Sequence, residues 1–341
     1  MHLKIKSATT PLSGEEVEHM KAVVFEKIGG PEVLKIGEVP KTEVKPGMVL
    51  IKVRAAGINF ADTLFRQGQY MMQPTFPDTP GLEAAGVIEA VGDGVTTLKP
   101  GQRVAGMGSK MYAEYALAPA TQVIPIPDSM NFEEGAAFPI QVLTAWHMLH
   151  TSHKTERGQT VLVHSAAGGV GVVAVQIAKA AGARVIGTVS RDDKIGLVKE
   201  HGADEVINYA THDFAEETNR LTGGRGVDLI LDAVGATTMD KGLTCLAPFG
   251  HLILYGRAGG APEPLNLFRL FERSVKVSGF TLYAVAPVPE VMRRGIEESL
   301  RLIAEKKVRI VIGKTFPLAQ AAEAHRFMES RQSFGKLLLI P

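Results

Sequence analysis

A glycine-rich turn between a short apolar strand and an apolar helix constrains the fold of this chain more than any other feature. The segment reads Val161-Leu-Val-His-Ser-Ala-Ala-Gly-Gly-Val-Gly171. In dinucleotide-binding folds, the second glycine of such a turn lets the backbone approach a pyrophosphate, and the third lets the helix pack closely on the strand. Gly168 and Gly171 hold these positions here, with Ala166 in the first. The N–H groups and dipole at the helix start would bind the phosphates. We therefore expect cofactor contacts along the turn, at Ala167, Gly168, Gly169, Val170 and Gly171.

A tight turn that binds no ligand would use glycine in the same way. The pattern beyond the turn favours the dinucleotide, because short strands at Arg184–Val189, Glu205–Asn208 and Val227–Asp232 alternate with helices. His251–Tyr255 continues the series. Such alternation predicts a parallel sheet with helices on both faces, which binds ligands at the carboxyl ends of its strands.

The chain on either side of this pattern is rich in β-structure. From Lys21 to about Gln141, short strands such as Met48–Arg54 are separated by turns that contain glycine and proline. After Ala284 the sequence predicts an amphipathic helix over Pro289–Lys306, and then strands at Val308–Ile312 and Lys336–Ile340. We therefore predict an α/β protein in which a Rossmann doubly wound domain (143–283) is inserted in a β-rich domain (20–142 plus 284–341). Residues 1–19 would be an extension or linker.

Composition excludes several classes of function. The 341 residues suit two domains, and the formal net charge of +1 gives no electrostatic reason to expect nucleic acid as a partner. No apolar run approaches the roughly 20 residues that cross a bilayer, and no signal peptide is apparent, so we expect a cytoplasmic protein without membrane contact. The single cysteine, Cys245, excludes a four-cysteine zinc lobe. His147, His150 and His153 lack a carboxylate or cysteine nearby to complete a metal site, so we expect solvated histidines and no metal.

The residues after the second strand of the pattern indicate which nucleotide is bound. Enzymes that use NAD usually carry an acidic residue at this point, bonded to the ribose 2′-OH. Ser190 stands there instead, and Arg191 and Lys194 follow it. A hydroxyl and two cations suit a 2′-phosphate, so we predict NADPH. The alternative is that Asp192 or Asp193 binds the ribose, although both lie where acidic residues favour a helix start in any case.

Several stretches together resemble one family. They are Met20-Lys-Ala-Val-Val, Ala56-Gly-Ile-Asn-Phe-Ala-Asp62, Gly81-Leu-Glu-Ala-Ala-Gly86, Leu143-Thr-Ala145, the glycine turn, Val206-Ile-Asn-Tyr209 and Leu337-Leu-Leu-Ile-Pro341. They are similar to the zinc-free quinone oxidoreductases, the zeta-crystallin-like branch of the medium-chain dehydrogenase/reductase superfamily. This resemblance implies that the β-rich domain is GroES-like. It also implies that Asn59 and Leu82 stand where zinc-binding relatives carry a cysteine and a histidine.

The resemblance implies roles for further residues. Those expected around the 2′-phosphate are Ser190, Lys194 and Tyr209. Those expected near the nicotinamide are Thr144, Tyr255, Gly256, Arg257, Phe280 and Leu282, and we also place Lys336 in the cofactor-binding set. Asn59, Asp62 and Tyr70 would line the substrate cleft, whereas Leu64 departs from a tyrosine that is common in the family. The resemblance also implies a homodimer, paired through a sheet edge at His251–Tyr255 and Ser274–Gly279.

The expected chemistry is hydride transfer from NADPH to a quinone or an α,β-unsaturated carbonyl compound. Negative charge then develops on the carbonyl oxygen, and the amide of Asn59 and the hydroxyl of Tyr70 are candidates to stabilise it. Asn59 could equally cap a turn, Tyr70 could be a surface aromatic in a loop, and Asp62 could cap a helix. Two other functions stay open: an enoyl-thioester reductase module of a polyketide or fatty-acid assembly line, and a nucleotide-binding structural protein without turnover.

Overall fold

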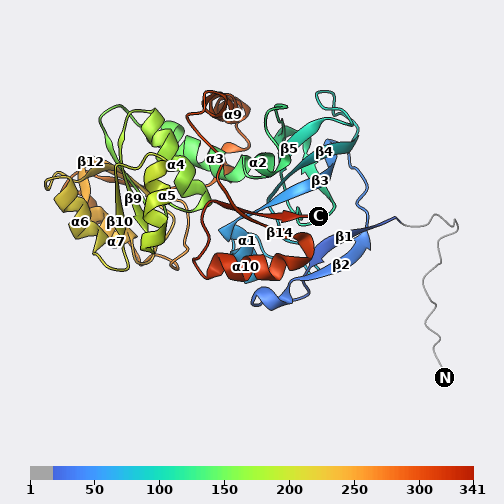
Figure 1. Ribbon diagram of the computed structural model, residues 1–341, viewed down its shortest axis with the longest axis horizontal. Helices are drawn as coiled ribbons and strands as arrows, with labels where there is room; N and C mark the ends of the chain where they lie inside the picture. Colours follow the sequence, from blue (N-terminus) through green and yellow to red (C-terminus); the bar gives the residue numbers. More distant parts are fainter. Residues whose placement is uncertain (1–17) are drawn as a thin grey trace, which may run out of the picture.

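The computed structural model describes residues 18–341 and has two sheets, each covered by its own helices (Figure 1). All strands of the six-stranded sheet lie between Thr160 and Gly279, whereas the strands of the seven-stranded sheet come from before and after that stretch. The α/β class and the insertion of a Rossmann-type sheet in a GroES-like β-rich part are confirmed. The domain limits at 142/143 and 283/284 stay a prediction.

The six-stranded sheet is parallel throughout, in the order β10-β9-β8-β11-β12-β13. Its strands are β8 (Thr160–Val163), β9 (Arg184–Val189), β10 (Glu205–Asn208), β11 (Val227–Asp232), β12 (Leu246–Leu254) and β13 (Lys276–Gly279). Central strands such as β8 are buried along their whole length, as an unbroken apolar run requires when helices cover both faces. The covering helices are α4 (Gly169–Ala180), α5 (Ile195–Glu200), α6 (Phe214–Leu221) and α7 (Met239–Thr244).

The seven-stranded sheet has the order β14-β15-β3-β4-β5-β7, with β6 also paired to β3. Its strands are β3 (Met48–Ile58), β4 (Glu83–Val91), β5 (Arg103–Met107), β6 (Tyr115–Pro119), β7 (Val123–Pro125), β14 (Ile312–Pro317) and β15 (Lys336–Ile340). A separate hairpin pairs β1 (His19–Val24) with β2 (Lys35–Pro40). The remaining helices are α1 (Phe60–Arg66), α2 (Phe132–Ala136), α3 (Pro139–His147), α8 (Leu282–Val285), α9 (Pro289–Ala304) and α10 (Ala321–Glu329).

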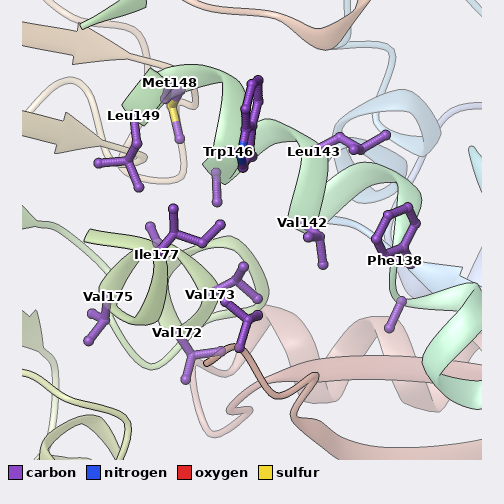
Figure 2. Packing of buried hydrophobic residues seen from close by; sticks show 14 of the residues in the cluster. Phe138, Val142, Leu143, Trp146, Met148, Leu149, Val172, Val173, Val175 and Ile177 are labelled. Carbon is purple, nitrogen blue, oxygen red and sulfur yellow. The ribbon is translucent and has the colours of Figure 1, made fainter. Parts of the chain in front are cut away.

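One helix pair joins the two parts. Figure 2 shows Val142 of α3 pointing toward Val173 and Ile177 of α4, in the space between these helices; all three are buried. This apolar packing holds the side of α3 that carries Gln141 and Thr144 near the glycine turn, from which α4 begins.

The structure corrects four expectations. The strand expected at Val308–Ile312 begins only at Ile312, because the chain before it runs in a coil. β12 is not a sheet edge, since it lies between β11 and β13. His147 is fully buried rather than solvated. His19, which was predicted to lie in the N-terminal extension, belongs to β1. The prediction of an extension or linker over residues 1–17 lies outside the described residues. Within the described part of the chain, no helix is long and apolar enough to span a bilayer.

Candidate functional site

A cavity of about 1810 Å³ extends along the boundary between the two sheets and is lined by residues from both parts. One end lies beyond β9, where Ser190 and Lys194 line it. The middle passes the glycine turn, and the other end reaches Asn59, Leu64 and Tyr70. A cleft of this size between two domains is the usual place for a cofactor and its substrate together.

The glycine turn has the close-packed backbone that a dinucleotide site requires. A Cβ added to Gly171 would lie 2.2 Å from the Ser165 carbonyl oxygen, so only glycine fits the first turn of α4. The Gly168 N–H donates to Ser165 O at 2.8 Å, and the Gly335 N–H donates to Ala167 O at 2.8 Å. The predicted contact residues of the turn all line the cavity: Ala167, Gly168, Gly169, Val170 and Gly171. The start of α4 is therefore built to receive an anionic group.

At the end beyond β9, Ser190, Lys194 and Tyr209 line the cavity together, as the sequence predicts. The Lys194 Nζ donates to the carbonyl oxygens of Arg331 and Ser333, both at 2.7 Å. Partial burial lowers the pKa of Lys194 from its ordinary value. This cluster of a hydroxyl, a phenol and an ammonium has no carboxylate among its three members.

The neighbouring charged residues point elsewhere. Arg191 forms an ion pair with Asp193 at 2.7 Å, and Asp192 accepts a hydrogen bond from the Asn208 amide at 2.7 Å. None of Arg191, Asp192 and Asp193 lines the cavity. Arg191, a predicted cofactor residue, is thus not brought to the cavity with Ser190 and Lys194. The two acidic residues that could have bound the ribose instead already have protein partners. Arg331 does line the cavity, but no local pattern in the sequence pointed to it.

The residues expected near the nicotinamide meet in the middle of the cavity. Thr144, Tyr255, Gly256, Arg257, Phe280 and Leu282 all line it. Burial raises the pKa of the Tyr255 hydroxyl above its ordinary value, so this tyrosine is neutral at physiological pH.

Gln141, which the sequence analysis did not single out, also lines this part of the cavity. Its side chain is 1% exposed, yet neither its amide nitrogen nor its oxygen has a hydrogen-bond partner. A Cβ added to Gly169 would lie 2.5 Å from the Gln141 oxygen, so the carboxamide packs directly on the glycine turn. Since buried polar groups are almost always paired, these two atoms are available to a ligand.

A buried cluster closes the end of the cavity beside Leu82. The Lys336 Nζ donates to Asn59 Oδ1 at 2.6 Å and to Glu83 Oε1 at 2.5 Å. The Asn59 amide donates back to Glu83 Oε1 at 3.0 Å, and the Ile140 N–H donates to Glu83 Oε2 at 2.8 Å. Lys336 and Glu83 are 3% and 0% exposed. Lys336, predicted to bind the cofactor, therefore belongs to the Asn59 cluster.

Asp62 lies behind this cluster and does not line the cavity. Its Oδ2 accepts hydrogen bonds from the Asn59 backbone N–H at 2.7 Å and from the Tyr112 hydroxyl at 2.8 Å. The first of these fixes the start of α1, so the helix-capping alternative describes the contact that the structure shows. Burial raises the pKa of Asp62 to about 7 despite these two hydrogen bonds.

Asp62→Asn should remove a pH dependence of stability. Between the ordinary pKa of 3.8 and the folded value of about 7, the folded protein holds a proton that the unfolded chain releases. Asp62 therefore lowers the free energy of unfolding of the wild type by an amount that grows by roughly 2 kcal/mol from pH 5 to pH 7 and then levels off. The stability of the variant relative to the wild type should rise over that interval, which urea unfolding at pH 5, 7 and 8 measures. A constant difference would contradict the elevated pKa.

The outer wall of the substrate end carries Tyr70, which is partly buried, and Tyr283, which is 42% exposed; both line the cavity. Burial, with the nearby Tyr283, raises the pKa of Tyr70, so its hydroxyl keeps its proton. Leu64 lies on the same wall, with Met71 and Met72 on the exposed loop. The wall thus combines apolar side chains with two phenols that keep their protons.

The fold and this cavity define a class of protein. A GroES-like β-rich part and a Rossmann-type sheet with a shared cleft are the architecture of the medium-chain dehydrogenases and reductases. Two family models agree: "Alcohol dehydrogenase GroES-like domain" matches residues 45–128 and "Zinc-binding dehydrogenase" matches residues 169–299.

The most similar proteins narrow the class to one family. A quinone oxidoreductase of Pseudomonas aeruginosa is 38% identical, over 94% of this chain and 99% of the relative. A 2-haloacrylate reductase of Burkholderia is 36% identical, over 94% and 98%. The Escherichia coli quinone oxidoreductase complexed with NADPH superposes with a TM-score of 0.90 at 34% identity, over 94% of this chain and all of that structure. This chain belongs to the quinone oxidoreductase, or zeta-crystallin-like, branch of the superfamily, and it is an oxidoreductase that takes a nicotinamide cofactor.

A zinc ion, which the name of one matching family implies, does not fit the residues present. The oxygens of Asn59 and Glu83 both accept from the Lys336 ammonium, which already occupies the centre of the cluster with a positive charge. Leu82 offers no ligand atom. Among residues 18–341, no group of three or more His, Cys, Asp or Glu side chains has the arrangement of a metal site.

Proposed function

We propose that this protein is an NADPH-dependent reductase of quinones or α,β-unsaturated carbonyl compounds. The observation that carries the proposal is the cluster of Ser190, Lys194 and Tyr209 at one end of the cavity, where a cation and two hydroxyls stand without an acidic residue at the end of β9. The opposite end carries the apolar side chain of Leu64 beside the neutral hydroxyl of Tyr70, which suits a flat conjugated acceptor. NADPH, when bound, supplies the two electrons and one hydrogen that the acceptor receives.

The residues along the cavity have separate tasks in this proposal. Lys194 and Ser190 bind the 2′-phosphate, and the backbone from Ala167 to Gly171 binds the diphosphate. The unpaired carboxamide of Gln141 donates to the cofactor beside this turn. Thr144, Phe280 and Leu282 hold the nicotinamide side, while Tyr255, Gly256 and Arg257 contact its ribose and carboxamide. Tyr70 lies on the acceptor wall, where its protonated hydroxyl can donate to a bound carbonyl group.

The test measures oxidation of NADPH and of NADH with a simple benzoquinone, an enone and crotonyl-CoA. NADPH oxidation by the quinone or the enone, with little by the thioester, is the expected result. Preference for crotonyl-CoA would instead favour an enoyl-thioester reductase. Tight NADPH binding without reduction of any acceptor would favour a nucleotide-binding protein without turnover, and preference for NADH would contradict the role of Lys194.

We also propose a cytoplasmic homodimer that pairs through the free edge of β13. Just before this strand, Phe268 and Phe271 are 79% and 76% exposed and stack with ring centroids 5.8 Å apart. Two such rings beside an unpaired strand edge form a surface that a second copy can cover. Sedimentation should give twice the chain mass of 36.5 kDa. Phe268→Ser with Phe271→Ser should shift the protein to monomer, and a monomeric wild type would contradict the proposal.

A further inference from the structure

We propose that the Lys336 ammonium takes the place of a metal cation in this site and donates a hydrogen bond to the carbonyl oxygen of the acceptor. This inference rests on the proposed reductase function. It reassigns Lys336 from the cofactor to the substrate and goes beyond the roles that were predicted for Asn59 and Tyr70.

Most of the hydrogen-bonding groups of the Asn59 side chain are already paired with protein atoms. Its Oδ1 accepts from Lys336 at 2.6 Å, and its amide nitrogen donates to Glu83 at 3.0 Å. The second amide hydrogen faces the Gly57 carbonyl at 3.5 Å, which is at the limit of a hydrogen bond. Asn59 therefore holds Lys336 in place and is not itself a free oxyanion donor.

The Lys336 ammonium has one N–H group that is not paired with any described residue. An ammonium carries three N–H groups, and the structure pairs two of them, with Asn59 and Glu83. Lys336 lines the cavity between Gly335 and the wall that carries Asn59 and Leu82. Its third N–H is thus the only charged donor of this cluster that is not yet paired with protein, on the wall where the acceptor binds.

The ammonium is held between two buried partners, one of which is itself fixed by a backbone N–H. Glu83 is fully buried and is fixed in turn by the Ile140 N–H at 2.8 Å. A fixed cation in a site from which water is largely excluded stabilises developing negative charge without reorganising at the moment of reaction. Since Leu82 supplies no ligand and the two oxygens are occupied, the cluster carries its positive charge on nitrogen.

The reaction balances with this assignment. Two electrons and one hydrogen, delivered as hydride by NADPH, form a C–H bond at the β-carbon, and the C=C π electrons move to leave the charge on the carbonyl oxygen. Lys336 stabilises that oxygen without losing its proton. A proton from water then completes the product at the α-carbon of an enone. In a quinone the proton goes to the oxygen, and loss of one proton from the reduced ring carbon, with protonation of the second oxygen, gives the hydroquinone.

The experiment compares the wild type with Lys336→Met and with the double variant Glu83→Gln/Lys336→Met. The double variant avoids the uncompensated buried carboxylate that could unfold the single one. Lys199→Met is the matched control, because it removes one lysine charge from an exposed position on α5 that does not line the cavity.

The main readout needs no turnover. 4-Nitrophenol, bound to protein loaded with NADP⁺, is titrated by its phenolate absorbance. The wild type and Lys199→Met should lower the pKa of the bound phenol below its value in water, and both Lys336 variants should lose that shift. Enone turnover (kcat/KM) should fall about 100-fold in the Lys336 variants, while NADPH affinity measured by fluorescence stays within about threefold.

Two results would overturn the assignment. One is an equal phenol pKa in all variants that remain folded. The other is a loss of NADPH affinity comparable to the loss of turnover, which would return Lys336 to the cofactor site. Failure of the reductase proposal is seen separately, since the wild type would then reduce no acceptor at all.

Discussion

Lys194→Ala is expected to weaken NADPH binding about 10- to 100-fold and to leave NADH binding nearly unchanged. The ammonium lies in a pocket with Ser190 and Tyr209, and a charged hydrogen bond to a phosphate contributes roughly 1.5–3 kcal/mol. NADH lacks the 2′-phosphate, so it loses no such contact. Calorimetric titration of both cofactors measures the ratio of their dissociation constants. A ratio equal to that of the wild type would contradict the binding of the 2′-phosphate by Lys194.

A second variant separates phosphate recognition from general damage to the cavity. Gln141→Leu removes a carboxamide that lies against Gly169, at the glycine turn, which both nucleotides would contact alike. It should weaken NADPH and NADH by similar factors. If Lys194→Ala behaved in the same way, its effect would come from the lost hydrogen bonds to Arg331 and Ser333 and not from the phosphate.

Gly171→Ala is expected to destabilise the fold and to abolish cofactor binding. The added Cβ would lie 2.2 Å from Ser165 O and 2.9 Å from Ala166 Cα, and both are backbone atoms that cannot rotate away. Moving α4 off β8 to relieve the clash should lower the free energy of unfolding by about 2–4 kcal/mol and displace the phosphate-binding N–H groups.

Gly196→Ala is the matched control for that experiment. Gly196 lies in helix α5, and a Cβ there would meet nothing within 4 Å. Alanine should stabilise this helix by about 0.5–1 kcal/mol. The thermal unfolding temperatures of the two variants should therefore change in opposite directions, and NADPH binding should be lost only in Gly171→Ala. A Gly171→Ala protein with normal stability would contradict the close packing of turn and helix.

The sequence predicted the fold where the physical signal was local. Strands β9, β10 and β11 were each predicted with the ends that the structure shows, because buried parallel strands are short apolar runs bounded by turns. The Val308–Ile312 prediction was wrong for the same reason. An apolar run of that length also fits a buried coil, and only the pairing of β14 with β15 decides where the strand begins.

The site was predictable where a motif fixes backbone geometry. The glycine turn and the position of Ser190 and Lys194 after β9 required only the register of one strand–turn–helix unit. Gln141 and Arg331 gave no such signal, because what brings them to the cavity is packing between segments far apart in the chain. For Lys336 the sequence indicated a place in the site but not its partner Glu83. Glu83 lies on β4, far from Lys336 in the sequence, and only the pairing of β15, β3 and β4 brings the two residues together.

The stretch from Arg331 to Lys336 connects the two ends of the cavity. Its carbonyl groups accept from Lys194, its Gly335 N–H bonds the glycine turn at Ala167, and its Lys336 reaches Asn59. A bound nucleotide that shifts this stretch therefore also shifts Lys336 beside the acceptor. Linkage requires the effect of the nucleotide on acceptor binding and the effect of the acceptor on nucleotide binding to be equal in free energy. Heterotropic cooperativity between nucleotide and acceptor should follow, transmitted along a few consecutive residues instead of through a hinge.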